Sequence, residues 1–324
     1  MRLRPVDIWP RPRLRYRAWI PVRRRNSQVE TRLAQMYPDS NPVLFSSARA
    51  GLYALVRHLE LTRADLVWSP RFSSHCVIDA IARRATPSTW FRPDKLSAVL
   101  LIHQWGFLHK LPSPVSIPVI EDSADGLIRP GSAMFASGGR FELISLPKIL
   151  GCFGGGVVFC RHEADADRLR RVQADEGISP ARVQFLLRLM SGMSRSALTY
   201  WLGAEAENKG VVAPVLRDIM LALDRLDSVI EDRKEKIAIL SDLSPKWLPE
   251  SADRFPSNFP VEFSPQLLDA LLGSGFPVDS RHFNSGCSTD DQDWIKVIRV
   301  PLHQDMPLAQ VEQIALKARK CRKS

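Results

Sequence analysis

The chain has 324 residues, of which 45% are hydrophobic and 25% charged, so it can bury a sizeable core and is not a disordered protein. Its longest apolar runs are much shorter than a membrane-spanning helix, which argues against a transmembrane protein. Neither Cys-x-x-Cys nor His-Glu-x-x-His occurs among the five cysteines and seven histidines, so we expect no metal site.

The first 25 residues form a strongly basic segment. Nine arginines stand there against one acid, Asp7, so the segment accounts for most of the net charge of +10. We expect residues 1–27 to form an N-terminal arm that lies on a partner subunit, with weak contact to an anionic surface as the alternative. Because the charge is confined to this arm, the folded body has no basic face, and we expect no nucleic-acid partner.

Residues 28–240 predict a large α/β domain with a helical extension. Strands are expected at residues 65–69, 89–91, 98–102, 115–120, 141–145 and 156–160. Helices are expected at residues 28–36, 52–59, 76–84, 180–193 and 216–240, and residues 37–42 are expected to end the first of these helices. Short apolar strands that alternate with helices indicate a mostly parallel sheet flanked by helices.

Residues 241–324 predict a smaller C-terminal α+β domain. Prolines punctuate a connector at residues 245–260. Beyond it we expect strands at residues 261–263 and 295–300, and helices at residues 265–272 and 308–320.

Polar and glycine-rich motifs follow the predicted strands in a definite order. They are SSARAGL at residues 46–52, SPRFSSH at 69–75, VIEDSAD at 119–125, and SLPKILG at 145–151 with FGGG at 153–156. The first opens a helix, where free amides can hold a phosphate, and the third brings Asp122 to a strand end, where ligands of parallel sheets gather. From the residues alone, Asp122 could equally be a helix-capping carboxylate and Lys148 a surface lysine.

This order of motifs resembles the DegT/StrS-type nucleotide-sugar aminotransferases, a branch of the fold-type-I pyridoxal-phosphate (PLP) enzymes. Residues 47–52 are similar to the family's S-G-T-x-A-L turn, 119–125 to its V-I-E-D-A-A-Q strand end, and 147–156 to its T-K-N-L-G segment with following glycines. Residues 101–106, 275–277 and 300–303 resemble its H-x-Y-G, G-I-P and L-P-L-H segments. The resemblance extends from about residue 41 to the C-terminus.

The resemblance implies a fold-type-I PLP-transferase-like fold and an aminotransferase that uses PLP. It would move an amino group from glutamate to a keto sugar of a nucleotide sugar, in polysaccharide or glycan biosynthesis, as a homodimer. Lys148 would attach the cofactor as a Schiff base and transfer the substrate proton, and Asp122 would keep the pyridine nitrogen protonated. We expect apolar neighbours to bury Lys148 and thereby lower the pKa of its amine.

The resemblance also implies the remaining cofactor-binding residues. Ser47, Ala48 and Arg49 would hold the phosphate together with Ser145, His75 would stack on the ring, and Asp125 would lie beside it. Two positions depart from the family pattern. Leu143 stands where the family usually has a serine, and Asp125 stands where sugar aminotransferases commonly have glutamine.

Two alternatives stay open at this point. The chain could be a regulatory protein that keeps the PLP-enzyme fold, or a PLP enzyme of another reaction type. The cysteines show no regular pairing and the arm is unlike a secretory signal, so we expect free thiols and a cytoplasmic location.

Overall fold

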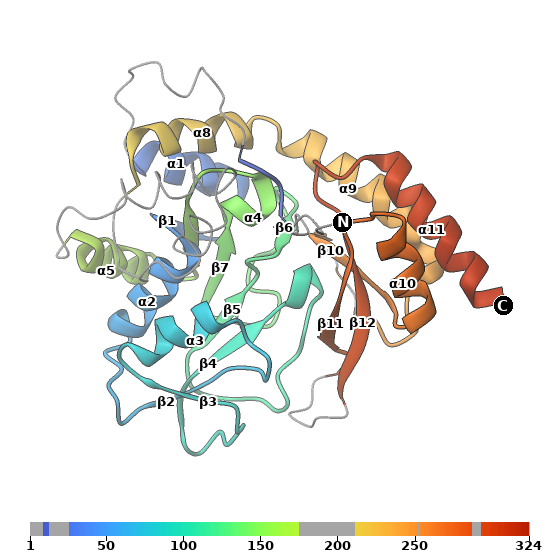
Figure 1. Cartoon of the computed structure of the whole chain (residues 1–324). Coiled ribbons are helices and arrows are strands. Elements are labelled where there is room, and N and C mark those ends of the chain that lie inside the picture. Colours follow the sequence, from blue (N-terminus) through green and yellow to red (C-terminus); the bar gives the residue numbers. More distant parts are fainter. Residues whose placement is uncertain are drawn as a thin grey trace.

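The computed structural model describes residues 9–12, 26–174, 211–249, 251, 253–286 and 293–323, so the helix expected at residues 180–193 lies outside the described residues. The main sheet has the strand order β1-β8-β7-β5-β4-β2-β3 (Figure 1). Its strands are β1 (Asn41–Phe45), β2 (Leu66–Trp68), β3 (Thr86–Ser88), β4 (Leu96–Ile102), β5 (Val119–Asp122), β7 (Phe141–Ser145) and β8 (Gly156–Cys160). Neighbours from β3 to β7 are parallel, whereas β8 runs antiparallel to β7 and β1.

Helices cover both faces of this sheet. One face packs against α2 (Ala48–His58), α3 (His75–Ala82) and α5 (Glu163–Ala174), and the other against α1 (Asn26–Met36), α4 (Leu146–Leu150) and α8 (Ala213–Leu223). Side chains alternate between the two cores along a strand: Leu143 and Val158 face α2, while Ile144 and Val157 face α8. The predicted α/β fold with a mostly parallel sheet and flanking helices is therefore confirmed.

Two sequence-based expectations for this region were wrong. The strand expected at residues 89–91 is instead β3, and Trp90 is 74% exposed. The helix expected before residues 37–42 does end at Met36, and the last two residues of that segment begin β1, an edge strand, where Pro42 removes no hydrogen bond that an interior strand would need. The helix expected over residues 216–240 is divided into α8 and α9 (Leu226–Leu240). The sequence predicts a single helix because one apolar stripe continues across the interruption.

The C-terminal part contains a three-stranded antiparallel sheet. Its order is β10 (Asn258–Glu262), β12 (Trp294–Pro301) and β11 (Asp279–Asn284), and it packs with α9, α10 (Pro265–Gly273) and α11 (Leu308–Lys323) (Figure 1). Trp105 and Phe107, which follow β4 of the large sheet, are buried in the same core. The two sheets are therefore joined by shared packing.

A second connection is made by a two-stranded sheet. It pairs β6 (Gly126–Ile128) with β9 (Arg254–Pro256), inside the segment expected to be a connector. A Cβ on Gly106 would lie 2.9 Å from the Cα of Gly126, so the chain after β4 passes directly against β6. Glycine is required at this crossing because φ of Gly106 is +109°. In the described parts of the chain, no helix combines the length and apolar character needed to span a bilayer.

Candidate active site

A cavity of about 550 Å³ lies where the carboxyl end of β5, the loop after β2 and strand β11 meet. The large sheet contributes Asp122, Asp125 and Lys148, and the small sheet contributes residues of β11 and β12. The carboxyl ends of parallel strands are the usual ligand-binding edge of such a sheet. Four predicted site residues, namely His75, Asp122, Asp125 and Lys148, line this one cavity.

Asp122 is the last residue of β5 and is almost fully buried. Its Oδ1 accepts a hydrogen bond from the Ala124 backbone N–H at 2.9 Å. Burial raises the pKa of the Asp122 carboxyl, and this effect exceeds the opposing influence of the nearby Lys148 amine. A buried carboxylate at a cavity wall is stabilised by a cationic N–H group, which is what a protonated pyridine nitrogen offers.

Lys148 lies in α4, where its apolar neighbours are buried but its own side chain is 25% exposed toward the cavity. Its Nζ is 3.1 Å from Oδ1 of Asp125. Burial lowers the pKa of the Lys148 amine, but Asp125, Cys76 and Asp122 together outweigh burial, and the net pKa is raised. The expected lowering is therefore wrong for the protein without cofactor, because acidic groups gather around the amine.

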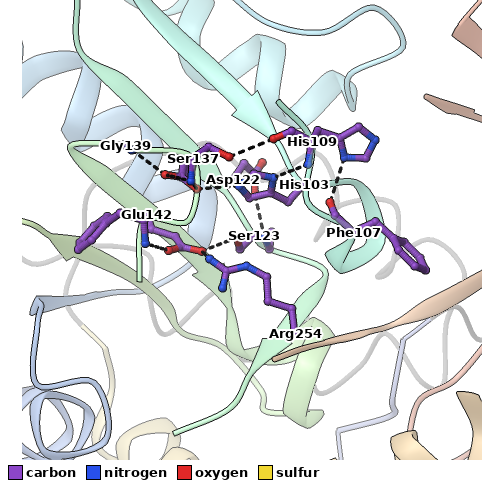
Figure 2. A network of polar contacts seen from close by, with 12 residues as sticks. His103, Phe107, His109, Asp122, Ser123, Ser137, Gly139, Glu142 and Arg254 are labelled. Carbon is purple, nitrogen blue, oxygen red and sulfur yellow. Dashed lines mark hydrogen bonds and ion pairs between the residues drawn. The ribbon is translucent and has the colours of Figure 1, made fainter. Parts of the chain in front are cut away.

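Asp122 is held between two buried neighbours, each in a polar network (Figure 2). On one side, Nδ1 of His103 accepts a hydrogen bond from the backbone N–H of His109 at 3.1 Å. The ring proton of His103 is therefore on Nε2, which donates to Oε2 of Glu121 at 2.7 Å. Glu121 also accepts from the amides of Ser137 and Gly139. Burial acts to raise the pKa of the Glu121 carboxyl, but these bonds outweigh it and the net pKa is lowered.

On the other side of Asp122, Ser123 Oγ donates to Glu142 at 2.6 Å. Glu142 is fully buried and also accepts from Arg254 Nη2 at 2.7 Å and from the backbone N–H of Phe135 (Figure 2). Because both neighbours are fixed, the direction of the Asp122 side chain is set before any ligand binds.

The predicted phosphate-binding turn lies at the start of α2. Ser47 is the N-cap residue, and its Oγ accepts from the Ala50 N–H at 3.1 Å. A Cβ on Gly156 would lie 2.2 Å from the Ala48 nitrogen, so only glycine at that position lets α2 begin directly against β8. Ser46 Oγ is buried without a hydrogen-bond partner in the described part of the chain, which leaves a hydroxyl available for an anion.

Arg49 and Ser145 lie around this turn, and with Ser47 and Ala48 they lie outside the residues that line the cavity. Burial lowers the pKa of the Arg49 guanidinium, opposed first by the nearby Cys76 thiol. Cys76 also influences the amine of Lys148, so Arg49 and Lys148 both lie near this thiol. Ser145 is buried at the end of β7. The phosphate-binding roles of these four residues stay predictions.

Leu143, the departure from the family's serine, is explained by packing. It is buried in the core under α2, and a Cβ on Gly51 would lie 3.1 Å from its Cδ1. A leucine at this position fills the space that Gly51 leaves open.

The far side of the cavity contains residues that the sequence analysis missed. Phe72 is 59% exposed at φ +61°, and its ring stacks on His282 at a centroid distance of 4.8 Å and lies edge-on to Trp294 at 5.2 Å. Arg281 and Arg299 line the same side, and Arg299 forms a two-point ion pair with Asp279. Trp9 of the arm lines the cavity near Lys148. The motif at residues 69–75 contained Phe72, but nothing in the sequence linked it to residues some 200 positions later.

These features fit PLP. Asp122, Lys148 and His75 line one cavity, and the hydroxyl of Ser46 lies without a hydrogen-bond partner, in the described part of the chain, just before the first amides of α2. Lys148 would hold the aldehyde end of the cofactor, Asp122 the pyridine nitrogen, and the α2 turn the phosphate.

Comparison with protein-family models matches residues 29–316 to a family described as “Putative PLP-dependent aminotransferase”. Comparison with curated proteins gives no match.

Several solved structures share the fold. The aminotransferase TlmJ from Streptoalloteichus hindustanus is 18% identical, with a TM-score of 0.69 over 98% of this chain and 99% of that one. The Helicobacter pylori aminotransferase PseC, involved in pseudoaminic acid biosynthesis, is 14% identical, with a TM-score of 0.63 over 96% and 98%. A DegT/DnrJ/EryC1/StrS aminotransferase from Brucella abortus is 15% identical, with a TM-score of 0.62 over 92% and 90%. The resemblance noted in the sequence is thus matched by the fold.

Proposed function

Since the chain belongs to this family of PLP-dependent aminotransferases, with PLP as its cofactor, we propose that it moves an amino group from glutamate to a keto sugar carried on a nucleotide. The product would serve polysaccharide or glycan assembly. The observation that carries the proposal is the division of the cavity into two unlike ends. One end has the carboxylate and amine that PLP needs, and the other has aromatic rings and arginines.

At the first end, each residue has a definite task. Bound PLP supplies an electron sink for the bond that breaks at the substrate carbon. Asp122 keeps its carboxylate toward the ring nitrogen, because Glu121 and Ser123 hold the strand end on both sides. The Nζ of Lys148 would take the proton from the substrate α-carbon as a general base and deliver it, as a general acid, to the C4′ carbon of the cofactor.

The second end suits a substrate that is both polar and anionic. Phe72 and His282 offer ring faces and edges against which a sugar or a base can pack. Arg281 is 55% exposed and shares Asp279 with Arg299, so it has donors left for a phosphate oxygen. A cavity of about 550 Å³ lies within the usual range for a cofactor or small-molecule site.

The test follows the two half-reactions separately. The holoenzyme should be yellow, lose its colour when L-glutamate is added, and regain it when a nucleotide-linked keto sugar follows. The same keto sugar without its nucleotide should restore the colour much more slowly. If glutamate bleaches the enzyme but only 2-oxo acids, and no keto sugar, restore the colour, the sugar assignment is wrong. Absence of any response to glutamate or other amino donors would instead point to a different PLP reaction or to a regulatory protein.

We also propose that the enzyme is a cytoplasmic homodimer. Fold-type-I sites are generally completed by a second subunit, as the sequence resemblance implies. Light scattering on the holoenzyme should give twice the chain mass of 36.5 kDa, and a monomer with full activity would contradict the proposal.

A further inference from the structure

The arginine-rich arm enters the active site at residues 9–12. Pro10 is buried, and a Cβ on Gly151 would lie 3.2 Å from its Cβ and 3.1 Å from the carbonyl oxygen of Arg11. The backbone N–H of Arg11 donates to Oδ2 of Asp305 at 2.6 Å. The segment is therefore held by the C-terminal end of α4 on one side and by the loop before α11 on the other. Figure 1 shows it as a short dark blue stretch beside α4.

The position of Gly151 makes this seat specific. Gly151 is the left-handed C-cap of α4, at φ +71°, and it follows Lys148 by less than one helical turn. A side chain at this position would crowd Pro10 and Arg11 and would strain the left-handed backbone, so the glycine serves both the helix end and the crossing segment.

Trp9 is the residue that this seat presents to the cavity. Its ring centroid is 5.1 Å from Nζ of Lys148, within the range of a cation–π interaction. The amine thus has Asp125 as its ion-pair partner and an indole as a second neighbour. Asp125 follows strand β5 of the large sheet, whereas Trp9 belongs to the N-terminal arm.

We propose that residues 9–12 form a strap and that Trp9 is a positioning residue for Lys148. The indole favours the protonated amine, limits the directions that the flexible lysine can take, and shields it from water. The anionic groups around Lys148 would otherwise hold the ammonium in several orientations, because a lysine head group is a point charge on a long stem. This inference rests on the proposed role of Lys148, but not on the sugar.

The test measures the Lys148 amine in the protein without cofactor. Competitive labelling with acetic anhydride across a pH series, followed by mass spectrometry of the Lys148 peptide, gives the pH midpoint of the amine and its limiting rate. For Trp9→Leu we expect the midpoint to fall by about half a unit, and labelling below the midpoint to be about threefold faster, as loss of a cation–π interaction implies. The limiting rate at high pH should also rise, because the shield is gone.

Two variants separate this effect from a general loss of structure. Trp9→Phe keeps an aromatic face and should restore part of the midpoint shift. Trp90→Leu removes an exposed tryptophan in the loop after β3 and should label like the wild type. If Trp9→Leu and Trp90→Leu give the same midpoint and rate as the wild type, the positioning role is wrong.

The strap itself is tested through its seat. Asp305→Ala removes the acceptor of the Arg11 N–H and should shift the midpoint in the same direction as Trp9→Leu, by a smaller amount. The double variant should behave like Trp9→Leu alone, because the seat acts only through the indole. Additive shifts, or no shift in Asp305→Ala, would overturn the strap. Holoenzyme assays that measure the glutamate half-reaction and the keto-sugar half-reaction separately then show whether the sugar proposal fails independently.

Discussion

The two ends of the cavity are built in different ways. The cofactor end is made by strand β5 and helix α4 of one sheet, and buried networks through Glu121 and Glu142 fix it (Figure 2). The other end is made by a loop residue, Phe72, that meets His282 of a second sheet, and much of it is exposed. Chemistry common to a whole enzyme class would thus be supported by a buried, hydrogen-bonded part of the molecule, and the proposed substrate selection by an exposed surface that can change one residue at a time.

The comparison predicts how variants divide. Changes at the cofactor end should impair both half-reactions, since both use the same ring. Changes at the other end should impair only the half-reaction of the acceptor. The predictions below run from the largest expected effect to the smallest.

Lys148→Ala should have the largest effect. Loss of the proton-transferring amine is expected to slow both half-reactions by about 10²–10⁴-fold. Borohydride reduction, which fixes PLP to a lysine, should leave no cofactor on the Lys148 peptide of this variant. Lys95→Ala, at an exposed lysine, is the control and should be labelled at Lys148 like the wild type. Full labelling of another lysine, with activity retained, would contradict the assignment.

Asp122→Asn should come next. The amide cannot stabilise a protonated ring nitrogen, and by comparison with other fixed electrostatic groups we expect both half-reactions to slow by about 100-fold. PLP should still attach to Lys148, so this variant should keep the absorbance of the bound cofactor while its activity falls. Equal rates for Asp122→Asn and the wild type would show that the carboxylate has no catalytic part.

Arg281→Ala should affect only the acceptor. Loss of one charge-assisted bond to a phosphate is expected to raise KM for the nucleotide sugar by about 10-fold and to leave the glutamate half-reaction unchanged. Arg171→Ala, at an exposed arginine of α5, is the matched control. A change in the rate of the glutamate half-reaction would show that Arg281 acts at the cofactor end, and would contradict the division of the cavity into two functional ends.

Asp125→Asn should have the smallest effect. Burial lowers the pKa of Lys148, but Asp125 is the strongest of the acidic groups that raise it, so the folded pKa lies above the unfolded one. The contribution of this amine to the free energy of unfolding is therefore complete below the pKa that Lys148 has in the unfolded chain, and it is lost as pH rises through the pKa in the folded protein. In Asp125→Asn the pKa should fall, so PLP should attach faster at a given neutral pH. Stopped-flow absorbance across pH would show an unchanged profile if the ion pair is unimportant.

The sequence revealed the cofactor end better than the other. Strands at residues 141–145 and 156–160 were predicted at their true positions, because buried apolar runs bounded by glycine and proline have few alternative structures. Asp122 followed from its strand end. Phe72 and His282 could not be paired, since their contact depends on how two sheets pack. The pKa of Lys148 was misjudged for a related reason: flanking leucines predict burial, but not the acids that folding brings near.

The seat of residues 9–12 has a consequence for how the protein is made. Asp305, which receives the Arg11 N–H, is translated long after Trp9 and after strand β5 and helix α4, which form the cofactor end. The large sheet can form while synthesis continues, as N-terminal domains generally do. On the ribosome, then, a nascent chain would carry an unstrapped lysine until its C-terminal helix emerged, and capture of the cofactor before release would meet an open site.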